Sequence, residues 1–192
     1  YNWSSDLSEM NSAAASGLLI SNHSYGTVVG WALGPYSGNY GYHWFGSPSV
    51  SEVEDYKFGF YNSYASTVDY LAYEAPYYLI CQSAGNDRND RAPSSGTRHY
   101  IYDPQQMRWV QSTVERHADG WQDGYDTLIP RATAKNILTV GAIFGIDNYT
   151  SPKSAEMSSF SGYGPTDDGR IKPDIVSKGV GVYSPVYSYS YP

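Results

Sequence analysis

One short stretch of the sequence, residues 79–87, carries the residue types best suited to chemistry. It begins with Leu79-Ile80-Cys81, which predict a buried strand, and then changes to Ser83-Ala84-Gly85-Asn86. Small residues let the backbone of a ligand approach closely, because no side chain blocks it. An Asn at the tip of such a strand can point its amide N–H at a bound group and so supply half of an oxyanion hole. The alternative is a strand that ends in an ordinary turn, since Gly-Asn-Asp is typical turn chemistry.

The elements around this stretch are predicted to alternate between helices and strands. Helices are expected over residues 5–19 and 66–75, and strands over residues 18–22, 77–82, 136–143, 174–176 and 180–184. Buried strands interleaved with helices are typical of an α/β domain with a mostly parallel sheet. In such sheets ligands bind at the carboxyl ends of the strands. Both Ser24-Tyr25-Gly26 and Ser83-Ala84-Gly85-Asn86 sit at such ends.

Two longer stretches interrupt this alternation. Residues 30–65 are rich in Gly, Ser, Tyr and Trp and show little periodicity, which predicts irregular surface structure or an insertion. Residues 88–125 are polar, and Thr113–His117 is expected to form part of a helix. Loops of this length in a compact domain are usually functional or mobile.

Composition narrows the class of protein. The 192 residues are 41% hydrophobic and 16% charged, which indicates one globular domain. The formal net charge of -7 and the absence of any run of Lys or Arg argue against a nucleic-acid partner. No apolar run reaches the ~20 residues that a membrane span needs. The single cysteine, Cys81, excludes an intrachain disulfide and is interpreted as a buried, inert thiol.

Four segments, in their order and spacing, resemble the subtilisin-like serine proteases, or subtilases. They are residues 20–26 (Ile-Ser-Asn-His-Ser-Tyr-Gly), 83–87 (Ser-Ala-Gly-Asn-Asp), 134–142 (Ala-Lys-Asn-Ile-Leu-Thr-Val-Gly-Ala) and 160–176 (Phe-Ser-Gly-Tyr-Gly-Pro-Thr-Asp-Asp-Gly-Arg-Ile-Lys-Pro-Asp-Ile-Val). The Ser-Asn-His-Ser-Tyr-Gly version is similar to subtilases of Bacteroidetes-type bacteria. The resemblance implies an α/β, subtilisin-like fold, a mostly parallel sheet with helices on both faces that is incomplete in this chain, and a secreted or extracellular hydrolase.

The resemblance also implies roles for particular residues. Asn86 would be the oxyanion-hole donor. Ser24, Tyr25 and Gly26 would form one wall of a substrate groove, and Ser83, Ala84 and Gly85 the opposite wall. Tyr25 would be a large groove residue, and the pocket for the residue before the cleaved bond would accept apolar or aromatic side chains.

Three motifs of the family are absent from the sequence. They are the Asp-(Ser/Thr)-Gly, His-Gly-Thr-His and Gly-Thr-Ser-Met-Ala motifs that hold the catalytic Asp, His and Ser. The family order places the first two before Tyr1 and the third after Pro192. We therefore expect residues 1–192 to be the central part of one catalytic domain, with insertions near 30–65 and 88–125. Its partners would be a protein or peptide substrate and the rest of the parent polypeptide, and the chain alone should not hydrolyse peptides.

Histidines and acids offer two further candidates for chemistry. His23 is interpreted as a structural, hydrogen-bonded histidine and not as a catalytic base. No cofactor is expected to be required. The family often binds calcium, and Asp87, Asp90 and Asp126 offer hard oxygen ligands, although Asp87 and Asp90 are interpreted as solvated turn charges. No metal site is predicted.

A second function from another class stays open. The 21 tyrosines of the chain, and the aromatic residues of 31–64 in particular, are suited to wet binding surfaces. The chain could therefore belong to a non-catalytic, subtilase-like module that presents aromatic platforms to peptides or glycans. A nucleotide-binding domain is a poorer match, because Val140-Gly141-Ala142-Ile143-Phe144-Gly145 lacks the third glycine of a phosphate-binding loop.

Overall fold

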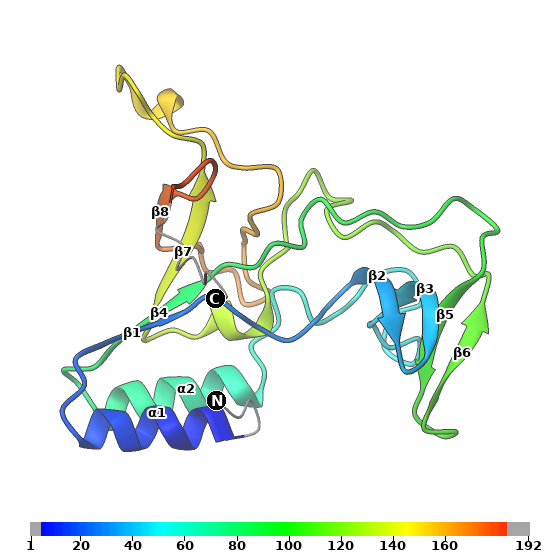
Figure 1. Cartoon of the computed structure of the whole chain (residues 1–192), viewed down its shortest axis with the longest axis horizontal. Helices are drawn as coiled ribbons and strands as arrows, with labels where there is room; N and C mark the ends of the chain where they lie inside the picture. The colour runs from blue at the N-terminus through cyan, green and yellow to red at the C-terminus, as the bar shows by residue number, and fades with distance from the viewer. Residues whose placement is uncertain (1–4, 184–192) are drawn as a thin grey trace, which may run out of the picture.

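The computed structural model describes residues 5–183, which fold around a four-stranded parallel sheet, sheet A. Its strands are β1 (Ile20–His23), β4 (Leu79–Ser83), β7 (Leu138–Ile143) and β8 (Ile175–Lys178), in the order β1-β4-β7-β8. Every pair is parallel, so the four carboxyl ends meet at one edge of the sheet (Figure 1). This confirms the α/β fold with a mostly parallel sheet. The strand expected over 180–184 is not formed by residues 180–183, and residue 184 lies outside the described range.

Two helices cover one face of sheet A. Helix α1 (Asp6–Ala15) and helix α2 (Ser63–Glu74) lie side by side below the sheet in Figure 1. Helix α2 begins where the Asn62 side chain accepts a hydrogen bond from the Ala65 N–H, at 3.0 Å. A single apolar cluster joins the helices to the sheet; its buried members are Met10, Ala65, Val68, Leu71, Tyr78, Ile80, Ala134 and Ile137. Within residues 5–183 no helix covers the second face, where the family resemblance implies one. No helix in this range is both long and apolar enough to cross a membrane.

The first strand is less buried than its apolar sequence predicts. Leu19 and Ile20 are 61% and 63% exposed, and Leu79 in the neighbouring strand is 42% exposed. The reason is position: β1 forms the edge of sheet A and pairs only with β4 among the described strands.

The two stretches predicted to be irregular combine into a second sheet, sheet B. It consists of β2 (Trp31–Tyr36), β3 (Asn39–Trp44), β5 (His99–Asp103) and β6 (Arg108–Ser112), in the order β2-β3-β5-β6. Two antiparallel hairpins meet through a parallel β3–β5 pair, and the sheet stands to one side of sheet A (Figure 1). Residues 31–44 are thus mostly strand and not irregular, whereas residues 45–62 contain no helix or strand, and the helix expected at 113–117 is not formed. The first hairpin turns at Ser37-Gly38, with φ of 48° and 80°, a pair of left-handed residues that suits a two-residue hairpin turn.

Aromatic and cationic side chains hold sheet B together. The His43 ring stacks on Tyr100 and meets the edge of Trp109, with ring centres 4.8 Å apart in both pairs. The Arg116 guanidinium lies 4.4 Å from the ring of the fully buried Trp44. Part of the tyrosine and tryptophan excess is thus core material of this small sheet.

Two short 3₁₀ helices, η2 (Pro130–Thr133) and η3 (Pro152–Ser154), complete the secondary structure of residues 5–183. Helix η2 is buried beneath sheet A and begins at Pro130, whose fixed φ suits a first helical position. It fixes the direction of the preceding residue, Ile129, which matters for the site.

Candidate substrate groove

The predicted site residues meet at two neighbouring hollows on the carboxyl edge of sheet A. One hollow, of about 200 Å³, is surrounded by the ends of all four strands. The other, of about 190 Å³, lies between the segments that follow β1 and β4. The two hollows share Ser24, Ser83, Gly85 and Asn86, while Ala84 lines the first and Tyr25 and Gly26 the second. The parallel register, which pairs His23 with Gln82, brings the two strand tips side by side.

Asn86 presents an unpartnered amide at the tip of β4. The residue is exposed, and its side-chain amide makes no hydrogen bond with any described residue. The preceding residue, Gly85, has a φ of 106°, which favours glycine and turns the chain sharply at the end of the strand. The Asn86 N–H donates to the Asp87 Oδ2 at 3.3 Å, which holds the backbone and leaves the side chain free. This geometry is suited to donating a hydrogen bond to a group bound in the groove.

Ile129 forms the floor between the two walls and was not found by the sequence reasoning. A Cβ atom added to Gly26 would lie 2.5 Å from the Ile129 Cδ1, and one added to Gly85 would lie 2.6 Å from the Ile129 Cγ2. The Ile129 N–H donates to the Ala84 carbonyl at 3.2 Å, so the floor is tied to one wall. Each wall has a glycine, Gly26 or Gly85, at the point where this buried side chain contacts the backbone directly. Only the position of Ile129 immediately before Pro130 hinted at a fixed direction.

Tyr25 lines the second hollow, and its side chain is held at its far end by buried charged groups. Its hydroxyl donates to the Asp6 Oδ1 at 2.7 Å, and its ring lies 4.7 Å from the Arg131 guanidinium. Arg131 pairs with Asp6 and also lies 4.4 Å from the ring of Tyr64. The buried Asp6 carboxylate requires donors, and the Tyr25 hydroxyl supplies one.

His23 belongs to a chain of hydrogen bonds behind the same wall. The Tyr78 hydroxyl donates to the Ser21 Oγ at 2.7 Å, the Ser21 Oγ lies 2.7 Å from the His23 Nε2, and the His23 Nδ1 lies 2.5 Å from the Tyr25 hydroxyl oxygen. Since the Tyr25 hydroxyl donates onward to Asp6, a consistent network assigns the ring proton to Nδ1. Burial lowers the pKa of His23. These contacts agree with the interpretation of a structural, neutral histidine.

The sequence suggested that Asp87 and Asp90 are solvated turn charges, but both residues are half-buried. Burial raises the pKa of Asp87 to about 6, with the Asp90 carboxylate adding to the effect, and burial also raises the pKa of Asp90. Arg88 turns away from both acids: its Nε donates to the Ser161 carbonyl at 2.8 Å. The Asp90 carbonyl accepts a hydrogen bond from the Asp119 N–H, so a distant part of the chain covers this loop. Sequence-local reasoning had no access to that contact.

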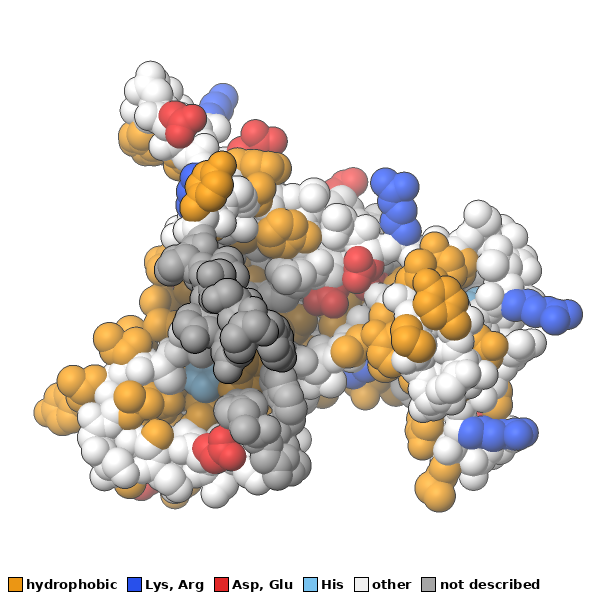
Figure 2. Space-filling model, in the orientation of Figure 1, with side chains coloured by type: hydrophobic (Ala, Val, Ile, Leu, Met, Phe, Trp, Pro, Cys, Tyr) orange, Lys and Arg blue, Asp and Glu red, His pale blue; other side chains and the backbone are white. Residues whose placement is uncertain are grey.

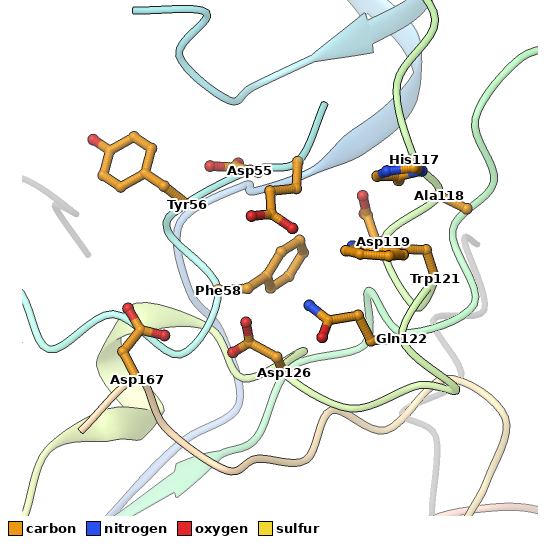
Figure 3. A pocket seen from close by; sticks show the side chains of 11 residues that line it. Asp55, Tyr56, Phe58, His117, Ala118, Asp119, Trp121, Gln122, Asp126 and Asp167 are labelled. Atoms are coloured by element: carbon orange, nitrogen blue, oxygen red, sulfur yellow. The ribbon is translucent and has the colours of Figure 1, made fainter. Parts of the chain in front are cut away.

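A second acidic group lines a hollow of about 260 Å³ beside Phe58 (Figure 3). Burial raises the pKa of Asp126 to about 6, and the like charges of Asp167 and Glu54 add to the effect. Asp126 lines this hollow, whereas Asp87, whose pKa is raised by other acids, Asp90 and Asp55, does not. Within residues 5–183 no group of three or more His, Cys, Asp or Glu side chains is arranged to hold a metal ion. The three acids considered for calcium therefore do not form one ligand set.

Residues 160–176, the last of the four segments that resemble the family, are hydrogen-bonded to β7 beside the groove. The Ser161 Oγ accepts the Ala142 N–H at 2.9 Å, next to the end of β7. Asp174 accepts from the Thr139 N–H at 2.7 Å and pairs with the Lys172 Nζ at 2.6 Å. Lys172-Pro173-Asp174 therefore fixes the turn against the neighbouring strand, as predicted from the sequence.

The fold defines an α/β protein with two neighbouring hollows at the carboxyl ends of its parallel strands. The sequence matches the model of the subtilase family over residues 3–191, and the chain belongs to this family. It is also 26% identical, over 154 residues, to the serine protease/ABC transporter B family protein tagD of Dictyostelium discoideum. That match covers 63% of this chain and 8% of the length of the Dictyostelium protein.

Proposed function

We propose that the full-length protein is a secreted serine endopeptidase in which this chain supplies the oxyanion-hole donor and the substrate groove. Family membership supports the reaction class, peptide-bond hydrolysis by an activated serine. The observation that carries the assignment to this chain is the free amide of Asn86 between the two strand tips. The catalytic Asp, His and Ser come from polypeptide outside residues 1–192, because the motifs that hold them are absent from the sequence.

In this mechanism the groove residues act before and during the attack on the substrate. An extended peptide lies between Ser24-Tyr25-Gly26 and Ser83-Ala84-Gly85 and pairs with their backbones as an added strand. The serine attacks the carbonyl carbon while the histidine takes its proton and the aspartate orients the histidine. The Asn86 Nδ2–H then donates to the oxygen that becomes negatively charged. Because the amide is already free and directed outward, no rearrangement is needed at the moment of reaction.

The test is the substitution Asn86→Ala in the full-length protein, with Asn89→Ala as the matched control. Asn89 is an exposed Asn in the same loop that contacts neither groove hollow. Loss of one oxyanion donor should reduce kcat by about 100- to 1000-fold with little change in KM, and the control should keep its rate. An unchanged kcat in Asn86→Ala would show that this side chain is not the oxyanion donor.

A non-catalytic, aromatic-rich module is the second candidate function. Hydrophobic side chains gather over sheet B in Figure 2, where Leu33 is 58% exposed and Tyr40 is 75% exposed. Reaction of the full-length protein with a fluorophosphonate separates the two functions, since only an activated serine is labelled. Labelling supports the peptidase. A folded protein that takes no label supports the module.

A further inference from the structure

The hollow between Gly26 and Gly85 carries one carboxylate, and we propose that it binds the basic side chain, Lys or Arg, of the substrate residue before the cleaved bond. This inference rests on the proposed function, because it names the substrate class of the same groove. It replaces the apolar or aromatic preference expected from the sequence. The assigned residue is Asp87, which lines the hollow together with Ile129 and both glycine walls.

The carboxylate faces the space where the substrate side chain would enter. A Cβ atom added to Gly85 would lie 3.2 Å from the Asp87 Oδ2, so this oxygen is placed against the wall of the hollow. Apart from Asp87, the Tyr25 hydroxyl is the one ionisable group among the residues that line the hollow, and it is directed to Asp6. Among the described residues that line the hollow there is no Lys or Arg. The lining therefore contributes one carboxylate and no cation from residues 5–183.

The charges behind Asp87 reinforce this sign. The carboxylates of Asp90 and Asp55 are the like charges that raise the pKa of Asp87 further. Lys57 pairs with Asp55 at 3.3 Å, and Arg88, the residue next to Asp87, is engaged by the Ser161 carbonyl and the Tyr163 ring. The field in the hollow is consequently negative, which attracts a cationic side chain and opposes an acidic one.

The walls suit the apolar part of such a side chain. Lys and Arg carry a stem of three or four methylene groups that packs on apolar surface while the charged end finds a polar partner. Ile129 and the flat backbones of Gly26 and Gly85 provide the apolar surface, and Asp87 lies at the end of the wall. The raised pKa of Asp87, caused first by burial, is consistent with a carboxylate that lacks a cation until the substrate binds.

The experiment compares the full-length protein with its Asp87→Asn variant on peptides that differ only before the cleaved bond. The three peptides carry Lys, norleucine or Glu, and norleucine has the stem of Lys without its charge. We expect kcat/KM to favour Lys over norleucine by about tenfold or more, the usual worth of a hydrogen bond to a charged group. Asp87→Asn should remove this preference, so that the variant cleaves the Lys and norleucine peptides with the same kcat/KM. Asp147→Asn, a substitution of an exposed acid outside both hollows, is the control.

Two results would overturn the inference and leave the proposed peptidase function standing. One is cleavage that favours norleucine or treats it like Lys; the other is a Lys preference that survives in Asp87→Asn. A binding measurement covers the case in which no peptide is cleaved. Benzamidinium, a cation, should bind the full-length protein and not Asp87→Asn, whereas neutral benzamide should bind both weakly. Equal binding of the two compounds would refute a cation pocket whether or not the protein is a peptidase.

Discussion

The contact between Ile129 and the two groove walls makes a prediction that separates Gly26 from Gly85. A Cβ atom at Gly26 would meet the Ile129 Cδ1 at 2.5 Å, and the φ at Gly26 is not left-handed, so the collision is the main obstacle to alanine. Overpacking of this kind costs about 1–3 kcal/mol, offset by about 0.4–1 kcal/mol from the stiffer unfolded chain. We therefore expect Gly26→Ala to lower the free energy of unfolding by about 1 kcal/mol.

The substitution Ile129→Val removes the Cδ1 atom that Gly26→Ala would contact. Alone it should cost about 0.5–1.5 kcal/mol, as methylene deletions in a core do. The double variant should be nearly as stable as Ile129→Val alone, which gives a favourable coupling of about 1 kcal/mol.

Gly85→Ala should behave differently with the same partner. Its clash is with the Ile129 Cγ2 at 2.6 Å, an atom that valine retains, and its φ of 106° strains any residue with a side chain. The cost should be about 2 kcal/mol or more, and Ile129→Val should not recover it. Urea unfolding of the single and double variants of the full-length protein measures both couplings. If valine rescues both alanine variants equally, or neither, Ile129 is not the floor of the groove.

Two further predictions concern the buried charges. Arg131→Met should lower the free energy of unfolding by about 3 kcal/mol, because it breaks the buried Arg131–Asp6 ion pair. The double variant with Asp6→Asn should lose less in urea unfolding than the sum of the two single variants; additive losses would contradict the pairing. Burial raises the pKa of Asp119 to about 9 from an ordinary value of 3.8. Between these two values the folded protein holds a proton that the unfolded chain releases. The free energy of unfolding should therefore fall as pH rises from about 4 to 9. Asp119→Asn should flatten that slope, by at most about 1.4 kcal/mol per pH unit, in melting curves recorded from pH 5 to 9; a variant with the wild-type slope would assign the pH dependence to another group.

The sequence alone was sufficient for the elements whose signals are local. The apolar run of Leu79–Ser83 and that of Leu138–Ile143 predicted two central strands of sheet A, and the helical spacing of Val68, Leu71 and Ala72 predicted helix α2. The order of small residues around Asn86 placed the groove at the ends of strands. These features depend on periodicity and on residue size, which can be recognised from residues that are close together in the sequence.

Sheet B and the charge of the groove depended on contacts between distant residues. The β3–β5 pair joins His43 to Tyr100, and Asp119 reaches back to the Trp31 N–H at 2.9 Å. No local pattern marks such pairings, so residues 30–65 read as irregular and Asp87 as a solvated turn charge. Tyr25 gave the same difficulty, because its side chain is oriented by Asp6 and not by its neighbours in sequence. The chain's sequence determined the central strands of sheet A and where they end; the tertiary structure decided the strands of sheet B and the surroundings of Asp87 and Tyr25, because burial and hydrogen-bond demand arise only once the segments have packed together.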